Sequence, residues 1–241
     1  MAFWFENKDT EEEIQVVGPM DPHGLALLEH IRTGQAQWFD YFYHGSKVPS
    51  MTLCSSMYLE PSDAQIEVVK RTVALCRGKI LDIGAGGGFA ALILQDSGMD
   101  VTALDISTYC VKAMESIGVN NCVIGDIREY KESKYDTLIL LDSVLGCAGS
   151  IEGISILLKH LSTLLLDGGQ ILLHDGMVES GVRVFEWSGY FQYKHYLGES
   201  FQWCNISADK LTEIAGQIGL DVTLPYEDDI EGRYLARLVF S

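Results

Sequence analysis

Short apolar runs alternate with longer stretches through the middle of the chain, and this alternation predicts the architecture. Each apolar run is five to seven residues long and rich in Val, Ile and Leu, as strands buried on both faces of a sheet are. Strands are expected at 79–83, 100–105, 121–125, 135–141 and 169–174, and helices at 88–97, 107–117 and 151–166. Alternation at this spacing favours a parallel sheet with helices on both faces.

A further helix is predicted just ahead of the first of these strands. Ser62-Asp-Ala-Gln65 has the pattern of a capping box, in which the side chains at both ends bond to each other's backbone N–H. The helix then runs to about Cys76, with Ile66 and Val69 on one face.

The first 60 residues are predicted to form a helical cap. Asp21-Pro22 is a good helix start, and this helix should end near Gly34. A second short helix is predicted over residues 36–43, which are strongly aromatic. These rings either dock the cap on the core or line a substrate pocket. The remaining residues, 61–241, are predicted to form the main domain.

The pattern changes after residue 174. Residues 182–193 and 199–204 alternate in period two around Leu197-Gly198, which predicts a β-hairpin inserted at about 181–205. A helix over 207–219 and two closing strands, 220–224 and 233–240, bring the sheet to seven strands. The predicted class is therefore α/β with one inserted hairpin.

Composition narrows the range of partners. The chain has 241 residues, of which 47% are hydrophobic, enough for one α/β domain with additions. Its net charge of −17 disfavours nucleic acid, which is bound through Lys and Arg. The six cysteines form no C-x-x-C pair, so neither a zinc site nor any other metal site is expected. Without a signal peptide or a long apolar run, we expect a cytoplasmic protein that is not bound to membranes, either a monomer or a homodimer.

A glycine turn and a distant acid are the main functional signal. The strand at 79–83 is followed by Gly84, Gly86 and Gly88, and glycines let a backbone pass close to a ligand. The next strand ends in Asp105, 21 positions beyond Gly84. At this spacing a Rossmann-type unit places a carboxylate on a bound ribose.

Asp82 and the alternate glycines resemble the acid-x-G-x-G-x-G signature of class I methyltransferases, which use S-adenosylmethionine (SAM). The resemblance implies SAM as cofactor, S-adenosylhomocysteine as product, and a Rossmann-like sheet of order 3-2-1-4-5-7-6 whose last strand is antiparallel. A dinucleotide-dependent oxidoreductase fits less well, because Phe89 stands where that fingerprint needs a third small residue.

The resemblance also implies roles for residues at successive strand ends. The glycine turn would lie against the methionine portion, Asp105 would hold the ribose, and Asp126 would bind the adenine amino group. The predicted cofactor contacts are Asp82, Gly84, Ala85, Gly86, Gly88, Asp105, Ile106, Asp126, Ile127 and Asp142. Each acid also has a structural alternative as a helix cap or turn residue.

The acceptor side is less well specified. His174 ends the fifth predicted strand and is the candidate general base, with a structural hydrogen bond or substrate positioning as its alternatives. Tyr43, His44 and Asp175 are further candidates for contact with the substrate. The fourth strand lacks the Asn/Asp-Pro-Pro-Tyr motif of enzymes that methylate amino groups of bases or glutamine. A small-molecule or peptide acceptor is therefore expected, and no nucleic acid.

Two short stretches extend the resemblance. Asp21-Pro-His-Gly-Leu-Ala and Gly149-Ser-Ile-Glu-Gly153 are similar to a broad bacterial set of class I methyltransferases with mostly unassigned substrates. We predict O- or N-methylation of a small molecule by in-line displacement. A peptide or carboxylate O-methyltransferase and a non-catalytic SAM-binding protein are the alternatives.

Overall fold

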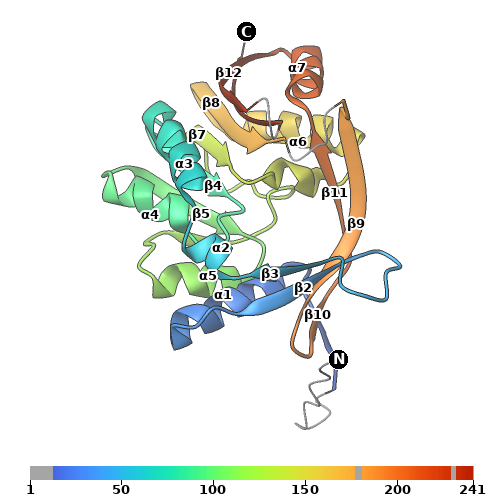
Figure 1. Cartoon of the computed structure of the whole chain (residues 1–241). Helices are drawn as coiled ribbons and strands as arrows, with labels where there is room; N and C mark the ends of the chain where they lie inside the picture. The colour runs from blue at the N-terminus through green and yellow to red at the C-terminus, as the bar shows by residue number, and fades with distance from the viewer. Residues whose placement is uncertain (1–12, 177–180, 229–231, 241) are drawn as a thin grey trace.

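A computed structural model of the protein describes residues 13–176, 181–228 and 232–240 (Figure 1). The first twelve residues of the predicted cap lie outside the described part of the chain.

Seven strands form the main sheet. They are β4 (Lys79–Ile83), β5 (Asp100–Asp105), β6 (Cys122–Ile124), β7 (Tyr135–Leu140), β8 (Leu165–Asp175), β12 (Leu220–Asp228) and β13 (Arg233–Phe240). Their order across the sheet is β12-β13-β8-β7-β4-β5-β6, which confirms the predicted 3-2-1-4-5-7-6. The strands from β6 to β8 are parallel, and β13 runs antiparallel to both of its neighbours, as predicted.

Helices cover both faces of this sheet (Figure 1). One face carries α3 (Asp63–Leu75), α4 (Phe89–Asp96) and α5 (Thr108–Ser116), and the other carries α6 (Ile151–Thr163) and α7 (Ala208–Gln217). Successive side chains of a strand point to opposite faces. In β4, Ile80 therefore packs with residues of α4 and α5, whereas its neighbour Leu81 packs with residues of α6.

The helix before the first strand begins as predicted. The Ser62 side chain accepts a hydrogen bond from the Gln65 N–H, and the Gln65 side chain accepts one from the Ser62 N–H. This reciprocal pair confirms the capping box. It also confirms that α3 starts immediately after residue 62.

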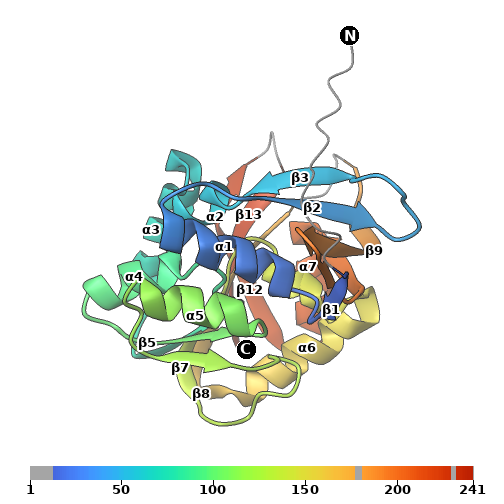
Figure 2. The same ribbon diagram turned by 90° about the horizontal axis from the view of Figure 1, so that it is seen from below.

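The first helix, α1 (Asp21–Thr33), packs against α5, as Figure 2 shows. The predicted boundaries hold, because Pro22 lies in its first turn and Gly34 ends it in a left-handed conformation (φ 69°). Ser107, the N-cap of α5, joins the two helices: its hydroxyl donates to an Asp21 carboxylate oxygen at 2.6 Å. The helix that precedes the main domain is thereby fixed to the end of β5.

The predicted second helix over residues 36–43 is wrong. Trp38–Tyr43 forms strand β2, which pairs with β3 (Met51–Cys54), so the segment before residue 61 is a mixture of helix and strand. Two shorter elements, β1 (Gln15–Val17) and α2 (Ser56–Leu59), complete it. Aromatic side chains favour strands, where alternate rings pack on one face.

The predicted hairpin exists and belongs to a second sheet. Its strands are β9 (Val184–Tyr193), β10 (Tyr196–Gly198) and β11 (Phe201–Ile206). The turn lies at Lys194-His195, because Tyr193 pairs with Tyr196, and not around Leu197-Gly198. Strand β2 pairs with the other edge of β9, so the N-terminal segment and the insertion form one sheet. Across the described ranges, no helix is long and apolar enough to span a bilayer.

The close packing of α1 on α5 yields a stability prediction. A Cβ at Gly24 would lie 2.7 Å from both the Cys110 nitrogen and the Ser107 hydroxyl oxygen. Gly24→Ala should therefore lower the free energy of unfolding by about 1–3 kcal/mol, as overpacking does. Urea unfolding measures the change.

Gly216→Ala is the matched control, because Gly216 lies in α7 and a Cβ there meets no atom within 4 Å. This substitution should leave stability unchanged or raise it by about 0.5–1 kcal/mol. Equal effects of the two substitutions would contradict the close packing of α1 on α5.

Candidate active site

The glycine turn follows β4 and stays open to a ligand at one position. Gly84, Gly86 and Gly88 all have positive φ angles, of 66°, 52° and 80°. A Cβ at Gly84 would come within 2.8 Å of Val144, so a larger residue does not fit there. At Gly86 the nearest atoms would be 3.9 Å away, which leaves room for close approach by a ligand.

Asp105 lies directly against this turn, as its spacing in the sequence predicted. One carboxylate oxygen accepts a hydrogen bond from the Gly86 N–H at 2.9 Å, and the other accepts one from the Ser107 N–H at 2.8 Å. Burial raises the pKa of Asp105, and these two N–H groups oppose that shift. A carboxylate accepts about four hydrogen bonds, so Asp105 keeps capacity for the hydroxyls of a ribose.

Asp82 is a buried acid with an unsatisfied oxygen. Asp82 is the penultimate residue of β4 and is 2% exposed, and its Oδ2 has no hydrogen-bond partner among the described residues. Burial raises its pKa to about 7, and the negative charges of Asp105 and Asp142 add to the effect. A cationic group placed here would relieve both the burial cost and the repulsion.

Ala85 lies within the same turn and is half-buried against the core beside β4. Its N–H and that of Gly84 both donate to the Leu104 carbonyl, at 3.1 and 2.8 Å. These bonds attach the turn to β5 independently of any side chain.

The three residues predicted to surround adenine lie in different environments. Ile106 is 39% exposed and is available to a ring, whereas Ile127 is 6% exposed and packs in the core. Asp126 pairs with the Arg128 side chain, whose Nε lies 2.9 Å from Oδ1. Burial acts to raise the pKa of Asp126, and Arg128 outweighs it, so the pKa falls below its usual value. Asp126 therefore carries a full charge and keeps free lone pairs.

The end of β7 carries backbone strain. Asp142 and Ser143 have positive φ angles of 51° and 66°, a region that non-glycine residues seldom occupy. The Ser143 N–H donates to the His174 carbonyl at 2.9 Å, which ties the ends of β7 and β8 together. Strain of this kind is concentrated at functional sites.

His174 and Asp175 end β8 and are both buried, with exposures of 7% and 1%. The His174 Nδ1 lies 3.5 Å from a carboxylate oxygen of Asp142. Asp175 accepts hydrogen bonds from the Gly176 N–H at 2.7 Å and from the Asn205 side-chain amide at 3.2 Å. Burial raises the pKa of Asp175 against these hydrogen bonds. Two titratable groups thus follow one another where the fifth strand ends, with their side chains on opposite faces of the sheet.

The two N-terminal substrate candidates are placed differently. Tyr43 is 42% exposed at the end of β2, with its ring 6.0 Å from that of Trp187. His44 is exposed in the turn that follows, where its N–H donates to the Ser188 carbonyl. No contact in the described part of the chain joins His44 to His174 or Asp175.

Sequence analysis missed an aromatic face on the second sheet. Contacts between ring centroids of 5.2–6.4 Å connect its members, which come from β2, β9 and β11. We call this set the aromatic face; it comprises Tyr41, Tyr43, Trp187, Phe191, Phe201 and Trp203. The period-two pattern of 182–204 marked the hairpin strands, but not their pairing with β2.

The aromatic face is linked by hydrogen bonds to Asp175 at the end of β8. The Trp187 indole N–H donates to the Asn205 side-chain oxygen at 3.1 Å, and the Asn205 amide donates to Asp175. Trp203 packs against η1 (Val144–Ala148), the short helix after β7, so closely that a Cβ at Gly146 would overlap its indole. The aromatic face is therefore linked both to Asp175 and to η1.

His23 is a second residue that the sequence analysis did not single out. It comes from α1, and its ring carbon Cε1 would lie 3.9 Å from a Cβ at Gly86. The ring packs on Tyr58 and Phe39 at centroid distances of 4.4 and 5.3 Å. Burial lowers its pKa to about 4, so it is neutral at physiological pH. Its Nε2 is buried and has no hydrogen-bond partner within the described ranges.

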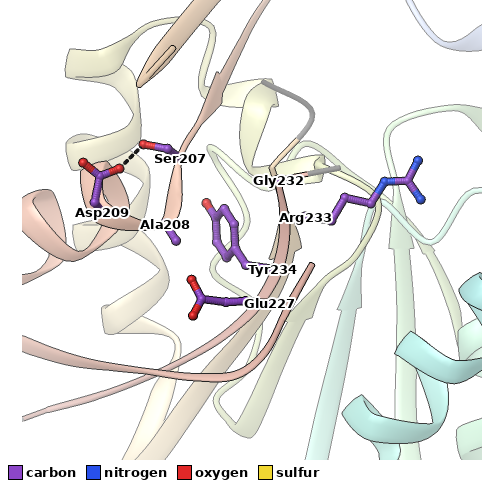
Figure 3. A pocket seen from close by; sticks show the side chains of 7 residues that line it. All are labelled: Ser207, Ala208, Asp209, Glu227, Gly232, Arg233 and Tyr234. Atoms are coloured by element: carbon purple, nitrogen blue, oxygen red, sulfur yellow. Dashed lines mark hydrogen bonds between the residues drawn. The ribbon is translucent and has the colours of Figure 1, made fainter. Parts of the chain in front are cut away.

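A separate hollow of about 300 Å³ lies near the end of β12 and the start of β13 (Figure 3). It is lined by Ser207, Ala208, Asp209, Glu227, Gly232, Arg233 and Tyr234. None of the residues predicted for the cofactor or the acceptor lines it. We therefore place the candidate site at the ends of β4, β5, β7 and β8.

Comparison with known proteins identifies the family. The family model of a methyltransferase domain matches residues 62–224. No curated protein sequence matches the chain.

Several solved structures share the fold. A SAM-dependent methyltransferase from Bacteroides fragilis, crystallised with S-adenosyl-L-homocysteine, is 26% identical over 95% of this chain and 98% of its own, with a TM-score of 0.81. The CcbJ methyltransferase from Streptomyces caelestis is 15% identical over 77% and 95% (TM-score 0.59). The glycopeptide N-methyltransferase MtfA is 16% identical over 78% and 97% (TM-score 0.57). At these identities the last two show the fold alone.

The family match spans the glycine turn, Asp105 and the ends of the first five strands of the sheet. The Bacteroides relative also binds the product of the cofactor that the glycine signature predicted. The chain therefore belongs to the methyltransferase domain family and is a class I SAM-dependent methyltransferase.

Proposed function

We propose that the protein transfers the methyl group of SAM to the oxygen or nitrogen of a small-molecule acceptor by in-line displacement. The observation that carries this proposal is the contact of Gly86 with Asp105, made next to the unsatisfied carboxylate of Asp82. Together these groups offer a close backbone approach, an acceptor for ribose hydroxyls and a site for a cation. SAM carries a ribose and an α-ammonium group, so its chemistry fits all three.

In this proposal each part of the cofactor has a named partner. Asp82 pairs with the α-ammonium group, the turn at 84–88 lies along the methionine portion, and Asp105 binds the ribose. Ile106 and Asp126 flank the adenine, with the backbone at Ile127 beside them. Asp142 lies between the cofactor and the acceptor.

The bound cofactor would supply a methyl group made electrophilic by its sulfonium. The protein's own residues then hold the acceptor in line with that methyl and exclude water, which accounts for much of the acceleration in such displacements. His174 takes a proton from an acceptor that carries one, and its contact with Asp142 orients the ring. The mixed segment before residue 61 and the insertion at 181–205 cover the acceptor.

Asp105 is the residue that we expect to bind the ribose. Asp105→Ala should weaken binding of S-adenosylhomocysteine about 10–100-fold, because one or two charge-assisted hydrogen bonds are lost. Isothermal titration calorimetry measures the change. Asp100→Ala is the matched control, since Asp100 is an exposed acid at the opposite end of the same strand, and its affinity should equal that of the wild type. Absence of binding to the wild-type protein would sink the proposal.

The second prediction concerns pH. Since the pKa of Asp82 is about 7, this carboxyl gains a proton below that pH and loses its attraction for the α-ammonium group. The dissociation constant of S-adenosylhomocysteine should therefore rise about tenfold between pH 8 and pH 6. Asp82→Asn should bind weakly at both values and remove the dependence. A pH dependence that survives in this variant would assign it to another group.

The third prediction concerns His174. His174→Ala should lower kcat/KM about 100-fold or more, because a general base contributes 10²–10⁴ to such rates, and should leave affinity for S-adenosylhomocysteine unchanged. Turnover is followed with labelled SAM and a metabolite extract, and methylated products are identified by mass spectrometry.

His160→Ala, in the last turn of α6, is the control for loss of an imidazole elsewhere. If His174→Ala keeps full turnover, the acceptor needs no base. That result would favour a carboxylate acceptor.

A further inference from the structure

We propose that the acceptor is an amine, bound as its ammonium form at Asp175 and packed against the aromatic face. This inference rests on the proposed methyl transfer and adds the chemical class of the acceptor. The juxtaposition of a buried carboxyl with several partly exposed rings carries it.

The position of the aromatic face is the first step. At one end, Phe191 lies 6.3 Å, centroid to centroid, from His23, whose ring borders Gly86. At the other end, Trp187 is linked to Asp175 through Asn205. The aromatic face therefore extends from the glycine turn to Asp175 at the end of β8. An acceptor in line with the methyl group would have to lie against it.

The exposure of these rings is the second step. Tyr41 is buried, whereas Tyr43 is 42% exposed, and Trp187, Phe191, Phe201 and Trp203 are partly exposed although they pack on one another. Rings in a sealed core would be buried, as Phe39 in the neighbouring cluster is. The face of an exposed aromatic ring attracts ammonium ions, because the ring quadrupole is negative above and below the ring plane.

The charged groups around Asp175 and His174 favour a cationic acceptor. Asp175 is buried, and the groups that most stabilise its ionised form are neutral donors and His174. Asp142 adds a second carboxylate within 3.5 Å of His174. No arginine or lysine is among the groups that shift the pKa of Asp175, and Arg128 and Arg183 are paired with other acids, Asp126 in one case and Asp209 and Glu213 in the other. A carboxylate or phosphate acceptor would be repelled here, whereas an ammonium would compensate the acids.

The chemistry balances for an amine. The bound ammonium R–NH₃⁺ gives one proton to the imidazole of His174, which becomes imidazolium. The nitrogen lone pair then forms the new N–C bond while the S–C bond breaks, and its electron pair stays on sulfur. The products are R–NH₂⁺–CH₃ and neutral S-adenosylhomocysteine, and His174 later releases its proton to solvent.

Three compounds of nearly equal shape test the inference. Phenethylamine, 2-phenylethanol and 3-phenylpropanoate are titrated into protein saturated with S-adenosylhomocysteine, and binding is followed by intrinsic tryptophan fluorescence, to which Trp187 and Trp203 contribute. The amine should bind at least tenfold more tightly than the alcohol, because it alone carries a positive charge that compensates the carboxylate. The carboxylate should not saturate.

Substitutions assign the preference to the site. Asp175→Asn should abolish the preference for amine over alcohol, whereas Asp221→Asn, an exposed acid on edge strand β12, should keep it. Tyr43→Leu should weaken the amine about 2–5-fold and leave the alcohol unchanged, because leucine keeps the apolar contact and removes the cation–π attraction. The exposed position of Tyr43 makes this variant independent of any folding defect in Asp175→Asn.

The outcomes separate the two proposals. If the wild type fails to bind S-adenosylhomocysteine in calorimetry, the proposed function is wrong. If the cofactor product binds but the alcohol or the carboxylate binds as tightly as phenethylamine, only the amine inference is overturned. The same holds if Asp175→Asn folds, binds S-adenosylhomocysteine and keeps the preference for the amine.

Discussion

The hydrogen bond from the Gly86 N–H to the Asp105 carboxylate is the interaction on which the site depends. It joins the turn after β4 to the end of β5. The two strands pair along their length, and this bond also holds their carboxyl ends together at the edge of the sheet. The turn can make this bond only because its glycines adopt positive φ angles and Gly84 leaves room for Val144. Ser107 holds the other oxygen of Asp105 and, through Asp21, attaches α1 to the same point.

The main sheet could be predicted because its signals are local. Each strand is a short apolar run, each helix follows at a regular interval, and the capping box at Ser62 marks its helix within a few residues. The resemblance supplied what local patterns lack, namely the strand order and the antiparallel β13. The position of Asp105 also followed from spacing, because parallel strands end at one edge of the sheet.

The second sheet could not be predicted because its pairings are distant in sequence. Strand β2 pairs with β9, so Tyr41 lies opposite Phe191, 150 positions further along. The alternation of rings over residues 38–43 fits a strand only once that partner is present, and without it we predicted a helix. The same distance hid His23, which reaches Gly86 only when α1 has docked on α5.

Strain and burial at the ends of β7 and β8 indicate that the proposed acceptor site is set by the backbone as well as by side chains. Positive φ angles at Asp142 and Ser143 cost about 1–3 kcal/mol each, and no glycine relieves them. Buried His174 and Asp175 add a further cost, because polar groups are removed from water. These positive φ angles and buried polar groups lower the stability of the fold. Their presence at one point, beneath the aromatic face and beside the cofactor turn, is explained most simply if that point is where the acceptor reacts.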